Sequence, residues 1–200
     1  MTVGIETLRA PGPTGNARGC PVEPHPPRPR TLRACQPIEA PRVTDRSSRH
    51  ESFTIEWELA FAPPVVFDAW ADPQAKARWF YGPPGQWTLQ ERSLDFRVGG
   101  REYVRGEMAG GPVSRFDALY YDIVAGERIV YAYEMHLDAT RISVSLATVE
   151  LTAIGRGPRP VPRMRFTEQA VFLDAWDDAG SRQGGTSALL DQFSASLTSR

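Results

Sequence analysis

Residues 164–197 read MRFTEQAVFLDAWDDAGSRQGGTSALLDQFSASL, and this stretch decides the fold. Its first part carries apolar residues at alternating positions, which predicts a strand with one buried face: Met164, Phe166, Ala170 and Phe172. The acidic run from Asp174 to Gly180 predicts a turn. Beyond it, residues recur on one face at helical spacing and predict an amphipathic helix: Thr186, Leu189, Leu190, Phe193 and Leu197. Such a helix needs a sheet to cover.

The chain upstream supplies the strands of that sheet. Apolar residues from Phe53 to Leu59 alternate with polar ones, which predicts the first strand. Pro63 and Pro64 suit the first turn of a helix, and two short helices follow, the second running through Phe80. Five further strands are predicted at residues 87–96, 102–108, 113–124, 129–137 and 141–154. Gly99-Gly100 predicts a two-residue hairpin between the first two of these strands.

The segment 141–154 has an unusual pattern. Ile142, Val144 and Leu146 share one parity, whereas Val149 and Leu151 share the other. Two explanations stay open: the strand is buried on both faces, or a bulge near Ala147 resets the register. Residues 155–162 are rich in proline and glycine and predict a rigid connection to the closing strand.

The predicted order of elements defines a fold class. A strand and two short helices precede a six-stranded meander and a long C-terminal helix. A meander that curves strongly around one helix encloses a hollow between the sheet and the helix. We therefore predict an α+β helix-grip fold, with a strongly curved antiparallel sheet wrapped around the C-terminal helix.

Four sequence motifs, in this order, resemble a known family. They are Phe67-Asp-Ala-Trp-Ala-Asp-Pro73, Ala77-Arg-Trp-Phe-Tyr-Gly-Pro83, Asp95-Phe-Arg-Val-Gly-Gly-Arg101 and Phe166-Thr-Glu-Gln-Ala-Val-Phe-Leu-Asp-Ala-Trp-Asp-Asp178. Together they resemble the START-like (SRPBCC) superfamily, in the branch similar to the C-terminal domain of the heat-shock chaperone ATPase activator. The resemblance covers about residues 52–198 and implies a helix-grip fold with an internal cavity.

The first 50 residues differ in composition from the rest of the chain. Prolines and arginines are interleaved there without helical or strand periodicity, so we predict a disordered tail at 1–50 and one folded domain at 51–200. An alternative places the true start near Val43. The tail carries eight arginines and four acidic residues, and the remainder carries a net charge of −5. An acidic domain argues against nucleic-acid binding.

The cysteines, the known binding motifs and the hydropathy of the chain bear on metals, cofactors and localisation. Cys20 and Cys35 both lie in the tail, and with His25 they lack the compact spacing of a metal site. The sequence has no phosphate-binding loop, dinucleotide fingerprint or nucleophile elbow, so we expect no metal and no cofactor. Because no apolar run is long enough to span a bilayer and no signal peptide is apparent, we expect a cytoplasmic protein without membrane partners.

Aromatic residues are the candidate ligand contacts. Ligand pockets are mostly apolar with a few placed polar groups, so rings facing the hollow could bind a hydrophobic small molecule. The same rings could instead simply fill the core. The candidates are Trp70, Trp79, Phe80, Trp87, Tyr103, Tyr131, Tyr133, Phe172, Trp176 and Phe193.

Arg101, Tyr103 and Arg105 share one face of a predicted strand. If that face looks inward, the arginines could clamp a carboxylate or enolate. If it looks outward, they form a solvated basic edge. The opposite face of the strand is less polar, which favours the outward orientation.

Glu168 is the candidate catalytic residue. It shares its parity with Phe166 and Phe172, so it faces the interior, where burial would raise its pKa and suit it to acid or base chemistry. His136 is a possible proton partner. The alternative is that Glu168 forms a salt bridge with an arginine. Asp174, Asp177 and Asp178 are expected to cap the turn and the helix entrance.

Three functions fit these observations. The first is a domain that binds a hydrophobic or aromatic small molecule. The second is an enzyme similar to polyketide cyclases and dehydratases, which would use the same cavity. The third, implied by the resemblance, is regulation of a chaperone ATPase through direct contact with the chaperone. A homodimer is compatible with all three.

Overall fold

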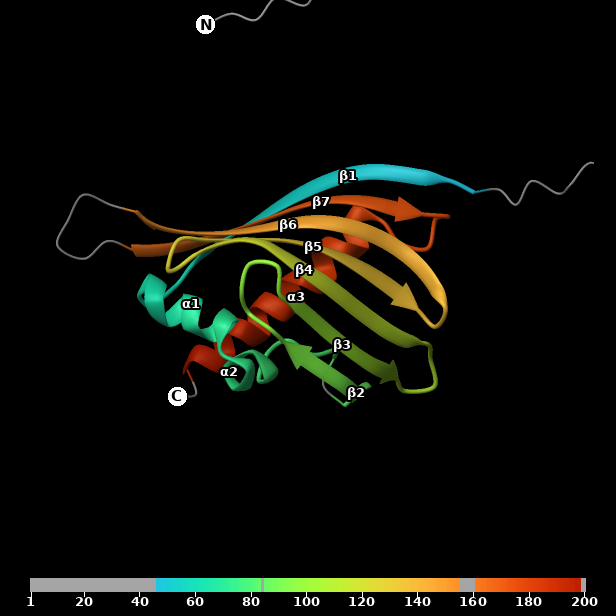
Figure 1. Cartoon of the computed structure of the whole chain (residues 1–200), viewed down its shortest axis with the longest axis horizontal. Helices are drawn as coiled ribbons and strands as arrows, with labels where there is room; N and C mark the ends of the chain where they lie inside the picture. The colour runs from blue at the N-terminus through green and yellow to red at the C-terminus, as the bar shows by residue number, and fades with distance from the viewer. Residues whose placement is uncertain (1–45, 84, 155–160, 199–200) are drawn as a thin grey trace, which may run out of the picture. The chain divides into compact units, whose positions relative to one another are not determined.

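The computed structural model describes residues 46–83, 85–154 and 161–198 (Figure 1). The predicted tail lies outside these residues except for positions 46–50, and so do Cys20, His25 and Cys35. Most of the connection predicted at 155–162 also lies outside them. No helix among the described residues is long and apolar enough to cross a membrane.

One antiparallel sheet of seven strands forms the framework of residues 46–198. Its order is β1-β7-β6-β5-β4-β3-β2, so the six strands from β2 to β7 form the predicted meander and β1 pairs with β7. The strands are β1 (Ser48–Glu58), β2 (Trp87–Leu94), β3 (Arg101–Met108), β4 (Val113–Val124), β5 (Arg128–Leu137), β6 (Thr140–Ile154) and β7 (Val161–Leu173). The first strand begins at Ser48, three residues before the predicted domain boundary.

Three helices accompany the sheet in the described residues. Helices α1 (Pro63–Ala71) and α2 (Pro73–Ala77) follow β1, and α3 (Ala179–Thr198) lies against one face of the curved sheet (Figure 1). We call the sheet face toward α3 the inner face. The sheet does not close into a barrel, because β1 and β2 remain at its edges. The α+β helix-grip fold is therefore confirmed.

Local sequence signals set the limits of the two short helices. Each begins with a proline, whose missing N–H is no loss in the first helical turn. The Asp72 carboxylate caps α2 by accepting a hydrogen bond of 2.7 Å from the Ala75 N–H. Helix α2 ends at Ala77 rather than running through Phe80 as predicted. Trp79 and Phe80 lie in the turn that follows.

The predicted two-residue hairpin at Gly99-Gly100 is wrong. Strand β2 ends at Leu94 and β3 begins at Arg101, so residues 95–100 form a longer loop. Gly99 has a φ of +78°, and a Cβ at Gly100 would lie 2.1 Å from the Asp95 carbonyl oxygen. Gly99 therefore serves the left-handed backbone conformation and Gly100 the close backbone approach, neither of which the dipeptide signal alone revealed.

Both explanations for the parity change in β6 are wrong. The register between β6 and β7 runs without a shift from Ser143 to Ile154, which rules out a bulge near Ala147. Val144 and Leu146 point to the outer face and are 39% and 41% exposed. From Ser143 to Ala147 the inner face of β6 carries the small residues Ser143, Ser145 and Ala147, all of them buried, and Val149 and Leu151 continue the same face.

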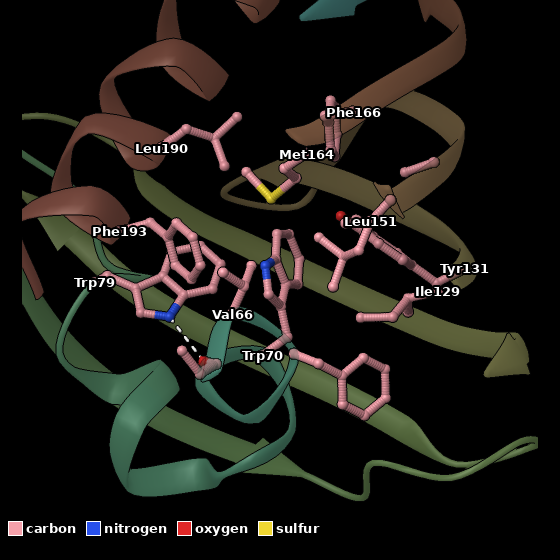
Figure 2. Packing of buried hydrophobic residues seen from close by; sticks show 14 of the residues in the cluster. Val66, Trp70, Trp79, Ile129, Tyr131, Leu151, Met164, Phe166, Leu190 and Phe193 are labelled. Carbon is pink, nitrogen blue, oxygen red and sulfur yellow. Dashed lines mark hydrogen bonds between the residues drawn. The ribbon is translucent and has the colours of Figure 1, made fainter. Parts of the chain in front are cut away.

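The core lies between α1, α3 and the inner face of the sheet. Figure 2 shows Phe193 of α3 beside Trp79 and Val66, and Leu190 of the same helix pointing toward Met164. The Trp79 ring centroid lies 4.8 Å from that of Trp70 and 5.0 Å from that of Phe193, in edge-to-face arrangements. The Trp79 indole N–H donates to the Ala69 carbonyl at 3.0 Å, which fixes the ring in place.

A buried ion pair ties α2 to the sheet. The Lys76 ammonium lies 2.6 Å from a Glu102 carboxylate oxygen, and the Tyr120 hydroxyl donates to the same oxygen at 2.5 Å. The ammonium also lies 5.0 Å from the ring centroids of both Trp70 and Phe80. Burial lowers the pKa of Lys76, and the charge of Glu102 opposes this effect.

We predict that Lys76→Met lowers the free energy of unfolding by about 3–5 kcal/mol, because it leaves the Glu102 carboxylate buried without its cation. Urea denaturation monitored by tryptophan fluorescence measures the change. The double variant Lys76→Met/Glu102→Gln should recover most of the loss. As a control, Arg101→Gln removes an exposed ion pair with Asp117 and should cost less than about 1 kcal/mol. Equal losses in the two single variants would contradict this account.

Candidate functional site

A cavity of about 480 Å³ lies between α3 and the inner face of strands β2 to β5. Its wall is dominated by aromatic and apolar side chains, as in small-molecule sites generally. The sheet and the α2–β2 region contribute Trp79, Phe80, Tyr81, Trp87, Val104, Met108, Phe116, Tyr131, Tyr133 and Met135, and α3 contributes Ser181, Arg182, Gly185, Thr186, Leu189, Leu190 and Gln192.

Trp87 forms part of the wall because two glycines make room for its indole. A Cβ at Gly106 would lie 1.9 Å from the Trp87 ring, and a Cβ at Gly82 would lie 2.3 Å from it. The indole N–H donates to the Ser114 hydroxyl at 3.0 Å. That hydroxyl in turn donates to the Gly106 carbonyl at 3.2 Å. The ring is therefore held in one orientation at the edge of the cavity.

A continuous row of rings joins α2 to the centre of the sheet. The Phe80 and Phe116 centroids are 5.0 Å apart and edge-to-face. Phe116 lies 5.0 Å from Tyr133, and Tyr133 lies 5.9 Å from Tyr131. Rings in mutual contact lose little freedom when a ligand binds, so this wall is preorganised for a flat, apolar partner.

Arg182, in the first turn of α3, organises a polar cluster at one end of the cavity. Its guanidinium donates to Asp177 at 2.6 and 3.1 Å, to the Tyr133 hydroxyl at 3.0 Å and to the Ser143 hydroxyl at 2.8 Å. A longer contact of 3.5 Å reaches Glu168. These bonds occupy all five N–H groups of the guanidinium.

Glu168 lies behind Tyr133 and has no exposed surface. Its Oε1 atom accepts hydrogen bonds from Tyr133 at 2.6 Å and Ser145 at 2.8 Å, whereas its Oε2 atom is buried without a partner among the described residues. Burial raises the pKa of the Glu168 carboxyl, and the nearby Arg182 opposes this effect. Burial also raises the pKa of Tyr133, so its hydroxyl stays protonated.

Six of the ten predicted ligand contacts line the cavity: Trp70, Trp79, Phe80, Trp87, Tyr131 and Tyr133. The other four do not. Tyr103 lies on the outer face of β3, because its neighbours Glu102 and Val104 face inward. Trp176 is 55% exposed in the turn after β7. Phe193 is buried behind Trp70 and Trp79, and Phe172 lies beneath the Arg182 guanidinium, 5.6 Å from it.

The structure agrees with some of the predictions for polar residues and not with others. Glu168 faces inward and meets an arginine, as the alternative interpretation held. His136 does not reach it, because the histidine turns to the outer face and bonds to Glu134 at 3.1 Å. Asp178 caps α3 by accepting the Ser181 N–H at 2.9 Å, as predicted, whereas Asp177 bonds to Arg182. Arg101 and Arg105 are exposed, which confirms the outward orientation.

Sequence reasoning missed Arg182, Phe116 and Gln192. In the sequence, Arg182 is only one of many arginines that could pair with Glu168. Gln192 donates from α3 to the carbonyls of Trp79 and Tyr81, at 3.4 and 3.3 Å, and so joins the helix to the loop after α2. No group of three or more His, Cys, Asp or Glu side chains in residues 46–83, 85–154 and 161–198 is placed to hold a metal ion.

The fold and the aromatic cavity define a helix-grip domain of the START-like class. The chain belongs to the family described as Activator of Hsp90 ATPase homolog 1-like protein, whose family model matches residues 60–198. No protein of curated function matches the chain.

Solved structures agree with this assignment. An uncharacterized protein from Rhizobium leguminosarum is 43% identical, with a TM-score of 0.71 over 78% of this chain and 100% of its own. A protein from Rhizobium loti is 41% identical, with a TM-score of 0.66 over 75% of this chain and 99% of its own. An AHSA1-like protein from Aeromonas hydrophila shares the fold at 19% identity, with a TM-score of 0.54 over 74% of this chain and 93% of its own.

The raised pKa of Glu168 predicts a pH dependence of stability. A carboxyl with a raised pKa binds more protons in the native state than in the unfolded state. Its contribution to the free energy of unfolding therefore falls as the pH rises above the pKa of the unfolded state. Glu168→Gln removes this titration. We therefore expect the stability of the variant relative to the native protein to increase between pH 4 and pH 7, measured by urea denaturation at each pH. If the stability of the variant relative to the native protein stays constant or decreases from pH 4 to pH 7, the raised pKa is contradicted.

Proposed function

We propose that the domain binds a hydrophobic or aromatic small molecule in the cavity between α3 and the sheet. The observation that carries this proposal is the preorganised row of rings that lines a space of about 480 Å³. That volume is within the range of known small-molecule sites, which is about 300–1,000 Å³.

The polar cluster around Arg182 favours a ligand that is largely apolar. Because every N–H group of Arg182 already has a partner in the chain, the guanidinium has little capacity left to clamp a ligand carboxylate. Asp177 also balances its charge at 2.6 Å. Binding would therefore come mainly from apolar contact with the rings, and a single polar substituent on the ligand would be sufficient to orient it.

Two neighbouring glycines of α3 provide a matched test. A Cβ at either position would meet no atom within 4 Å, but only Gly185 lines the cavity. Gly185→Leu should place its side chain at the cavity wall and weaken binding of an aromatic probe such as 2-naphthol at least tenfold. Gly184→Leu should leave the affinity within about twofold. Both substitutions should favour the helix to a similar extent, because each replaces glycine in a helix interior.

Quenching of tryptophan fluorescence by 2-naphthol and related ring compounds gives the affinities. A response that never saturates with any compound would contradict the proposed function. An equal loss of affinity in the two leucine variants would show that the probe binds elsewhere.

A second candidate is an enzyme similar to polyketide cyclases and dehydratases. The observation that favours it is the buried Glu168 carboxyl, which lies one hydrogen bond behind a tyrosine hydroxyl at the cavity wall. Under this proposal Glu168 starts protonated, as its raised pKa favours. The Tyr133 hydroxyl turns its O–H from Glu168 to a bound carbonyl or hydroxyl group, delivers its proton there and takes the proton of Glu168, which becomes a carboxylate. The third hypothesis, chaperone ATPase regulation, draws support only from the wording of the family description.

Under the enzyme proposal, Tyr133→Phe and Glu168→Gln should each lower turnover of a polyketide-like substrate by about 10²–10⁴, the usual contribution of acid–base catalysis. Affinity for the substrate should change by less than about fivefold, because the apolar wall is intact. Single-turnover kinetics separates the two quantities. Unchanged turnover in both variants would remove acid–base chemistry from this site and leave the binding proposal standing.

A further inference from the structure

The outer face of the sheet carries an arginine pair that the cavity does not involve. Five other arginines on that face each lie within 4.0 Å of a carboxylate: Arg101 with Asp117, Arg128 with Asp122, Arg141 with Glu134, and Arg163 and Arg165 with Glu56. Arg105 and Arg115 are different. Neither forms an ion pair or a side-chain hydrogen bond with any residue in the described part of the chain.

These two arginines are direct neighbours across strands. Arg105 of β3 is paired with Arg115 of β4 in an unbroken register from Arg101 to Glu107. Both point outward, because Val104 and Phe116, the adjacent residues on each strand, line the cavity on the inner face. Cross-strand partners have Cβ atoms about 4.5–5.5 Å apart, and like charges at this spacing destabilise a sheet.

Carboxylates lie near the pair on the outer face, but none among the described residues forms an ion pair with either arginine within 4.0 Å: Glu107 bonds to Gln90, and Asp117 bonds to Arg101. Glu91 of β2 is opposite Arg105, but the two side chains form no ion pair within 4.0 Å. His136 of β5 is opposite Arg115, and its ring bonds to Glu134. The Nε atom of Arg115 is buried without a hydrogen-bond partner. A ligand on the outer face cannot reach this buried atom, so the Nη groups are the donors that Arg115 offers there.

We propose that Arg105 and Arg115 bind a dianionic oxyanion, a phosphate group that is either free or carried as a monoester on a small molecule. Two guanidinium groups side by side present two forks of N–H donors, which match the tetrahedral oxygens of a phosphate. A dianion neutralises both positive charges, whereas one carboxylate would leave one charge uncompensated. The site lies on the opposite face of the sheet from the cavity, so it does not depend on the proposed ligand-binding function.

Titration with inorganic phosphate at pH 8, where phosphate is mainly a dianion, tests this proposal. Binding is followed by backbone amide NMR shifts at constant ionic strength, with chloride as the balancing ion. We expect saturable shifts at β3 and β4, and at least tenfold weaker binding in both Arg105→Gln and Arg115→Gln. Arg101→Gln is the matched control, because Arg101 lies on the same face of β3 but is paired with Asp117. It should change the affinity by less than twofold.

Two further anions distinguish the ligand classes. Acetate, a monoanion, should bind at least tenfold more weakly than phosphate, and glycerol 3-phosphate binding more tightly than phosphate would identify a monoester as the ligand. Shifts that do not saturate, acetate binding equal to phosphate binding, or an equal loss in Arg101→Gln would each overturn the proposal, because they indicate general surface charge.

Discussion

The guanidinium of Arg182 is the contact on which the arrangement of α3 and the sheet depends. Through it, the first turn of the helix is joined to Tyr133 on β5, Ser143 on β6 and Glu168 on β7. A buried charge is tolerated only with its hydrogen bonds satisfied, so α3 must begin where these partners converge. At the other end of the helix, Phe193 packs against Trp70 and Trp79. The cavity is the space left between these two attachments.

The same polar cluster explains the composition of β6. Glu168 and Arg182 need room and hydroxyl partners on the inner face, and Ser143, Ser145 and Ala147 supply both. The larger side chains of that strand segment, Val144 and Leu146, consequently point outward. A strand whose apolar residues face away from the core looks anomalous by periodicity alone, but it follows once the buried cluster is known.

Periodicity predicted the order of elements because each strand and helix has one buried face, and that face is visible in the sequence. It also placed Glu168 in the interior, since Phe166 and Phe172 share its parity. The partner of Glu168 could not be predicted, because the position of Arg182 depends on how α3 docks. The rotation of Trp87 into the wall could not be predicted either, since it depends on how the fold places Gly82 and Gly106 against the ring. Tyr103 and Trp176 were grouped with the cavity on residue type, which carries no information on direction.

The five tryptophans of the chain allow a direct test of the central claim that an apolar ligand occupies this cavity. Trp70, Trp79 and Trp87 line it, whereas Trp57 and Trp176 do not. In ¹⁵N-labelled protein titrated with 2-naphthol, the indole N–H signals of the three lining residues should shift together and saturate at one site, with each signal assigned by a Trp→Phe variant. The other two signals should stay within the range produced by solvent alone. Shifts confined to Trp57 or Trp176, or no saturable shift in any indole, would contradict the account.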